Sequence, residues 1–134
     1  MKKTAYALIS FSLLAFLACG CASGSFNLRS LAGINIADLE KARDKGKIKT
    51  VSLPYDTAFD KVLEILEKNK LTAFRKNRRK GYIIAIGFPK QETTTRVGIF
   101  FARLDDKNTE ITLSSLSSTC LSKAENIIFG ELEK

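Results

Sequence analysis

The sequence contains no histidine among its 134 residues. Histidine is the commonest general base and metal ligand in proteins, and it activates most serine and cysteine nucleophiles. Its absence excludes the usual Ser-His and Cys-His nucleophile pairs and any histidine-based metal centre. We therefore predict a protein that is not an enzyme, holds no metal and needs no cofactor.

Other catalytic and nucleotide-binding patterns are missing as well. The chain has no Gly-x-Gly-x-x-Gly motif, no phosphate loop and no calcium loop. Serines cluster at 114–118, but no lysine follows any serine at Ser-x-x-Lys spacing. Asp105 and Asp106 stand together in a polar segment that is typical of a turn. These residues are predicted to be strand, cap and turn positions with no chemical role.

The apolar residues at the start of the chain form a leader. Lys2 and Lys3 precede an uncharged stretch over 4–24, whose apolar part covers 5–18. A short basic segment, about a dozen apolar residues and then small residues is the layout of a secretory signal. A membrane-spanning helix needs about 20 apolar residues, and this run ends earlier. We therefore predict that residues 1–20 are an export signal.

Two cysteines follow the apolar run, in Leu17-Ala18-Cys19-Gly20-Cys21. Small residues before a cysteine at the end of such a leader resemble the lipobox of bacterial lipoproteins. The resemblance implies that the thiol receives a diacylglyceryl group and that the cysteine becomes the new N-terminus. We favour Cys21 as the lipidated residue and keep Cys19 as the alternative, in which case a retained Cys21 is a disulfide partner for Cys120. A simple signal cleaved near Ala22 and an uncleaved anchor helix are the other readings.

The rest of the chain is predicted to be a tether followed by one domain. Residues 21–34 are rich in serine, glycine and alanine and form the lipidated cysteine and tether, whereas 35–134 form the domain. Loss of Lys2 and Lys3 with the leader lowers the excess of basic over acidic residues from eight to six. The resemblance implies a cell-envelope location. Because Asp follows neither cysteine, the outer membrane facing the periplasm is favoured in an organism with two membranes.

Hydrophobic periodicity predicts an α+β fold. A short helix is expected over 35–44, and 57–68 has an apolar stripe typical of an amphipathic helix, with Thr57 and Asp60 as a capping box. A last helix follows a cap at Ser118 or Thr119. Strand patterns cover 48–53, 71–76, 82–88, 94–104 and 109–116. From them we predict a two-layer sandwich with a four-stranded antiparallel sheet and helices on one face, in the order β-α-β-β-β-α after the short N-terminal helix.

One marked basic run lies in the predicted turn between the second and third strands. It consists of Arg75, Lys76, Arg78, Arg79 and Lys80. These residues are candidates for contact with an anionic surface, such as phosphates of lipid headgroups or glycolipids. A solvated turn that protects a strand edge is the alternative. Nucleic acid would suit the charge, but an exported protein does not meet it, so we predict no nucleic-acid partner.

The strands over 82–88 and 94–104 carry few charges, and an uncovered edge there is a candidate for pairing with a partner strand. Tyr82, Phe88 and Phe100 are candidates for an aromatic patch on the face opposite the helices, and Phe74 is expected in the core. Partner binding is thus predicted to use a sheet edge, an aromatic face or the basic turn.

The function predicted from these features is that of a non-catalytic, membrane-anchored lipoprotein of the cell envelope. Its expected partners are the membrane, through the N-terminal lipid, and an envelope protein, polymer or anionic lipid or glycolipid. One alternative is a carrier module for a lipid or small ligand. A second is a thiol-dependent enzyme using Cys120, whose position near a helix start would lower its pKa. Against this, we expect Cys120 to be a small buried core residue.

Overall fold

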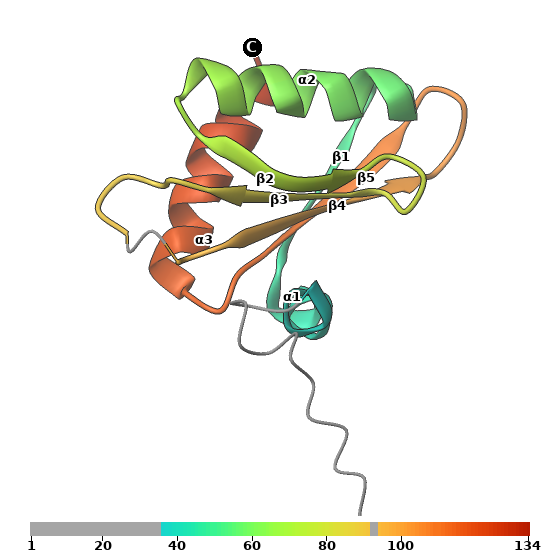
Figure 1. Ribbon diagram of the computed structural model, residues 1–134. Coiled ribbons are helices and arrows are strands. Elements are labelled where there is room, and N and C mark those ends of the chain that lie inside the picture. Colours follow the sequence, from blue (N-terminus) through green and yellow to red (C-terminus); the bar gives the residue numbers. More distant parts are fainter. Residues whose placement is uncertain (1–35, 92–93) are drawn as a thin grey trace, which may run out of the picture.

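The computed structural model describes residues 36–91 and 94–134, and Figure 1 shows how they are arranged. The predicted leader over 1–20, the cysteines Cys19 and Cys21 and the predicted tether over 21–34 therefore lie outside the described residues. In chain order the elements are α1 (Ile36–Lys41), the 3-10 turn η2 (Ala42–Lys45), β1 (Lys47–Val51), α2 (Tyr55–Lys68), β2 (Thr72–Asn77), β3 (Tyr82–Ile86), β4 (Val97–Arg103), β5 (Thr109–Ser114), α3 (Ser118–Ala124), the π-helical turn η3 (Glu125–Phe129) and α4 (Gly130–Leu132). The last three run on as one helix.

The strands form a single antiparallel sheet in the order β1-β5-β4-β3-β2. The predicted α+β class is confirmed, but the predicted count of four strands is wrong, because the sheet has five. Each segment with a strand pattern forms a strand of its own, and the predicted order left one of them out. β2 to β5 make a meander, and α2 crosses the sheet to connect the two edge strands, β1 and β2.

The main core lies between the sheet and the helices α2 and α3. Side chains alternate along β4, so that Val97, Ile99 and Phe101 face this core. The stripe on α2, which includes Phe59 and Leu66, packs against them. The periodicity of the two elements thus produced the burial that the sequence predicted for this face.

The short helix α1 lies on the other face of the sheet, as Figure 1 shows below the strands. Leu39 is fully buried against Ile84 and Phe100, which point away from the main core. The hydroxyl of Ser114 donates a 2.8 Å hydrogen bond to the carbonyl oxygen of Leu39 and attaches α1 to β5. The prediction that the helices lie on one face is therefore correct for α2 and α3 but wrong for α1. No local sequence pattern specifies the side of the sheet on which α1 packs.

The two long helices begin at residues other than those predicted. Pro54 precedes α2, its carbonyl accepts a 2.8 Å hydrogen bond from the amide of Ala58, and no side chain caps this end. The predicted capping box is wrong because Thr57 already lies inside the helix. Proline suits the helix start because its φ is fixed and its missing N–H is not needed there. In α3 the cap is Ser117, whose hydroxyl accepts from the amide of Cys120.

Candidate functional site

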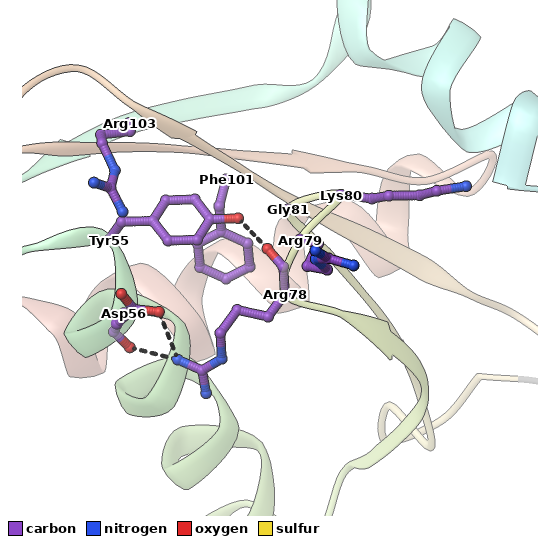
Figure 2. A pocket seen from close by; sticks show the side chains of 8 residues that line it. All are labelled: Tyr55, Asp56, Arg78, Arg79, Lys80, Gly81, Phe101 and Arg103. Carbon is purple, nitrogen blue, oxygen red and sulfur yellow. Dashed lines mark hydrogen bonds and ion pairs between the residues drawn. The ribbon is translucent and has the colours of Figure 1, made fainter.

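Residues 77–81, which are the last residue of β2 and the turn between β2 and β3, are held against the first turn of α2. The Tyr55 hydroxyl donates a 2.7 Å hydrogen bond to the carbonyl oxygen of Arg78, which is visible as a dashed line in Figure 2. Inside the turn, the side-chain oxygen of Asn77 accepts a 2.9 Å hydrogen bond from the amide of Lys80. The basic residues therefore stand on a docked turn with a defined conformation.

Gly81 closes this turn in a conformation that suits glycine. Its φ is +68°, and its carbonyl oxygen accepts a 2.8 Å hydrogen bond from the amide of Phe101. A Cβ atom at this position would lie 2.6 Å from the carbonyl oxygen of Phe101 and 2.8 Å from the hydroxyl of Tyr55. Glycine thus allows the turn to approach both β4 and α2 closely.

Arg78 belongs to the framework of the site. Its guanidinium contacts the carboxylates of Asp56, at 3.1 Å, and of Asp60. It also lies 4.6 Å from the centre of the Phe59 ring. The hydrogen bond from Arg78 lowers the pKa of Asp60, and the two carboxylates raise the pKa of Arg78. The two negative charges thus exceed the single positive charge of Arg78 in the middle of the predicted basic run.

A surface cleft of about 490 Å³ lies beside the docked turn. Figure 2 shows its walls, which consist of Tyr55, Asp56, Arg78, Arg79, Lys80, Gly81, Phe101 and Arg103. The guanidinium of Arg103, at the end of β4, lies 5.3 Å from the centre of the Tyr55 ring. Among the described residues, Arg79, Lys80 and Arg103 form no ion pair. The cleft therefore presents three cations on an aromatic wall.

The structure divides the predicted basic run. Arg79 and Lys80 line the cleft, whereas Arg75 and Lys76 lie on the exposed strand β2. Arg75 pairs with Ile84 and Lys76 with Ile83, so that the two side chains lie on opposite faces of the sheet. The sequence prediction therefore grouped five residues that do not form one surface.

Arg103 was missed in the sequence because its position depends on strand register. Tyr82, the first residue of β3, pairs with Phe100. The end of β4 therefore extends beyond the start of β3 and runs alongside the turn that precedes it. Only the pairing of these two strands could have placed Arg103 in the same cleft as Arg79 and Lys80.

Tyr55 contributes its ring to the wall and its hydroxyl to the turn. Burial raises the pKa of this hydroxyl, and the charge of Asp56 raises it further, while Arg103 and Arg78 act in the opposite direction. The hydroxyl stays protonated at neutral pH and continues to donate to Arg78. It is therefore a structural donor that holds the turn against α2.

The other candidate surfaces differ from the predictions. β3 and β4 are interior strands, so neither offers the predicted edge, and their low charge reflects burial on both sides. Tyr82 and Phe100 do lie on the face opposite α2 but pack with α1, whereas Phe88 belongs to the main core. Phe74, expected in the core, is 52% exposed, with the Arg96 guanidinium 4.2 Å from its ring centre.

Cys120 is fully buried in the first turn of α3. Burial raises the pKa of its thiol, and the nearby charge of Lys123 only partly opposes this. The expected burial is confirmed. The alternative of a reactive thiol required a lowered pKa, whereas removal from water raises it.

Within 36–91 and 94–134, no three metal-ligating side chains of the His, Cys, Asp or Glu type come together. No helix in these two ranges has the length and apolar character needed to cross a membrane. Neither a protein-family profile nor a curated protein sequence matches the chain.

Proposed function

We propose that this protein is a lipid-anchored lipoprotein of the cell envelope that acts as a non-catalytic binding module. The observation that carries the proposal is the leader, in which Lys2 and Lys3, the apolar run over 5–18 and the cysteines Cys19 and Cys21 follow one another in the order of a lipoprotein signal. The outer membrane, facing the periplasm, is the proposed location in an organism with two membranes.

The chemistry of the cleft supports binding rather than catalysis. Arg79, Lys80 and Arg103 supply positive charge, and Asp56 is occupied by Arg78. Neither a nucleophile with a base beside it nor a pair of free carboxylates lines the cleft. Cations on an aromatic wall attract and orient an anionic partner, which is the property a binding module needs.

The packing of the domain favours surface binding over carriage of a ligand inside it. A carrier needs a lined apolar cavity of about 300 Å³ or more. Between the sheet and α2 and α3, the described side chains form one continuous buried cluster that includes Phe59, Ile99, Phe101 and Ile128. A further cleft of about 540 Å³, beside β1, α2 and α4, opens on the surface.

Membrane anchoring is tested by cell fractionation of the full chain and of cysteine variants. We expect the wild type to sediment with membranes and Cys21→Ala to appear as an unprocessed or soluble form. If Cys19 is the lipidated residue, Cys19→Ala shows this behaviour instead. Cys120→Ala is the matched control and should fractionate like the wild type. Unchanged processing and membrane association of the Cys19→Ala/Cys21→Ala double variant contradict the lipid anchor.

Partner binding is tested by crosslinking in intact envelopes followed by purification of the full chain. A specific partner, or a specific lipid, should be recovered with the wild type and lost when Arg79, Lys80 and Arg103 are all replaced by alanine. Recovery of only abundant membrane lipoproteins, in equal amounts with both forms, contradicts a specific binding role.

A further inference from the structure

The cleft beside the β2–β3 turn has the charge and shape to bind a ligand with more than one anionic group. The Tyr55 ring has Arg103 on one side, 5.3 Å from its centre, and its hydroxyl end reaches the turn that carries Arg79 and Lys80. In Figure 2 the ring lies between Arg103 and Arg79, and the Lys80 side chain extends from the same turn in the direction away from the ring. The cations are therefore arranged at two ends of an aromatic wall.

Arg78 differs from the other three cations of the cleft because it is paired with carboxylates. Because Asp56 and Asp60 hold its guanidinium, Arg78 fixes the turn to α2, and the two carboxylates together outweigh its single positive charge. The three other cations find no carboxylate among the described residues and remain available to a ligand. Preorganised cations bind an anion with less loss of conformational entropy than those of a mobile loop.

Phosphate groups suit these cations better than carboxylates do. A guanidinium presents donors in a planar fork that matches the oxygens of a phosphate, and a lysine adds a compact charge. A phosphate ester carries up to two negative charges and three free oxygens, whereas a carboxylate offers one charge and two oxygens. The first turn of α2 adds a positive helix dipole, part of which Asp56 offsets.

The size of the cleft and its aromatic wall indicate a ligand larger than an inorganic ion. Its volume of about 490 Å³ lies within the range of about 300–1,000 Å³ that is typical of sites for small organic molecules. The Tyr55 ring, between the two cationic ends, offers an apolar surface for the C–H groups of a sugar.

We infer that this cleft binds a sugar that carries two phosphate groups, with Arg103 at one phosphate and Arg79 and Lys80 at the other. The same chemistry occurs in a soluble sugar bisphosphate and in the headgroup of a bisphosphorylated glycolipid. The inference rests on the proposed function, since it names the ligand class of the same binding module.

Titration calorimetry of the full chain, inserted in phosphatidylcholine nanodiscs, tests the ligand class. The probes are glucose 1,6-bisphosphate, inorganic phosphate and acetate at equal ionic strength. We expect saturable binding that weakens from the first probe to the last and decreases with added salt. Equal affinity for the bisphosphate and acetate, or no saturable binding in either this or the lipid experiment, overturns the inference.

Variants test the two ends of the cleft. Arg79→Ala and Arg103→Ala should each weaken bisphosphate binding about fivefold or more, in keeping with the usual effect of one cation beside a phosphate-rich surface. Arg103→Ala should also abolish the preference for the bisphosphate over inorganic phosphate. Arg75→Ala is the matched control, because it removes the same charge from β2 outside the cleft. An Arg75→Ala loss equal to that of Arg103→Ala contradicts the inference.

Nanodiscs that also contain lipid A, a bisphosphorylated disaccharide lipid, distinguish the two sources. If the headgroup enters the cleft, bisphosphate binding is competed and the amides of residues 77–81 exchange more slowly with solvent, except in the Arg79→Ala/Arg103→Ala variant. If the ligand is soluble, bisphosphate binding is unchanged. If neither glucose 1,6-bisphosphate nor lipid A binds, phosphate recognition is refuted. The proposed membrane anchor is not affected by that result, because cell fractionation tests it independently.

Discussion

At the scale of single residues, identical side chains have different roles in this protein. Arg78 and Arg79 are neighbours in the same turn, yet Arg78 is held by Asp56 and Asp60, whereas Arg79 lines the cleft without an ion pair among the described residues. The difference follows from the direction in which the turn presents each side chain to α2. Only part of the positive charge in this turn is therefore used in contacts within the domain.

Glycine at position 81 is predicted to be required for stability. In Gly81→Ala the methyl group would meet the Phe101 carbonyl oxygen at 2.6 Å, and the φ of +68° is unfavourable for alanine. We expect a loss of about 1–3 kcal/mol in the free energy of unfolding, measured by urea denaturation. Gly130→Ala is the control, because nothing lies within 4 Å of its added Cβ and the residue is helical.

The control should gain up to about 1 kcal/mol, since alanine is the better helix former. Equal stability of Gly81→Ala and the wild type would contradict the close approach of the turn to β4 and α2.

At the scale of elements, one carboxylate connects the last helix to α2. Glu131, in α4, contacts Lys68 of α2 at 2.6 Å and Lys134 at 2.8 Å. The hydrogen bonds from Lys134 and then Lys68 lower the pKa of Glu131 to about 2 from its usual value of 4.5. Because the folded-state pKa is lowered, this contribution to stability is present above the unfolded-state pKa and is lost as the pH falls toward 2.

Glu131→Gln is therefore predicted to lower the unfolding temperature at neutral pH by a small amount, because its two lysine partners are exposed and the ion pairs are screened by solvent. The difference from the wild type should vanish as the pH falls through 4.5 toward about 2. Glu64→Gln, which removes an exposed helix carboxylate 3.9 Å from Lys61, is the control. A Glu131→Gln difference that persists unchanged at low pH is incompatible with this linkage.

At the scale of the whole molecule, the sheet has buried side chains on both faces. The main core lies under α2 and α3, and the smaller cluster joins Leu39 of α1 to Ile84 and Phe100. Because Ile83 and Ile84 are adjacent in β3 but belong to different clusters, the backbone of the sheet couples the two cores. We expect α1 to be an integral part of the domain.

Leu39→Ala is predicted to lower the free energy of unfolding by about 2–5 kcal/mol, because the side chain is fully buried. Circular dichroism and tyrosine fluorescence should report one common urea transition. Leu116→Ala, at a position that is 61% exposed, is the control and should change stability by less than about 0.5 kcal/mol. A separate early transition, seen only by one probe, would show that α1 unfolds independently of the sheet.

Much of the fold could be predicted because it depends on local periodicity. The stripe on α2 and the alternation of Val97, Ile99 and Phe101 in β4 arise from the geometry of the helix and the strand themselves. The errors occur where neighbours in space decide. Phe74 was expected in the core, but the bulge between Ala73 and Arg75 lies on an edge strand, and the ring is exposed there.

The types of element, the basic turn and the leader pattern can be read along the chain, because each depends on residues that are close together in the sequence. That β3 and β4 are interior strands and that α1 covers the second face follows only from how the elements pack. The same packing places Arg78 between two carboxylates and brings Arg103 to the cleft that Arg79 lines. These contacts depend on strand order and register, which are set by packing between segments that are distant in the sequence. No short stretch of sequence specifies them.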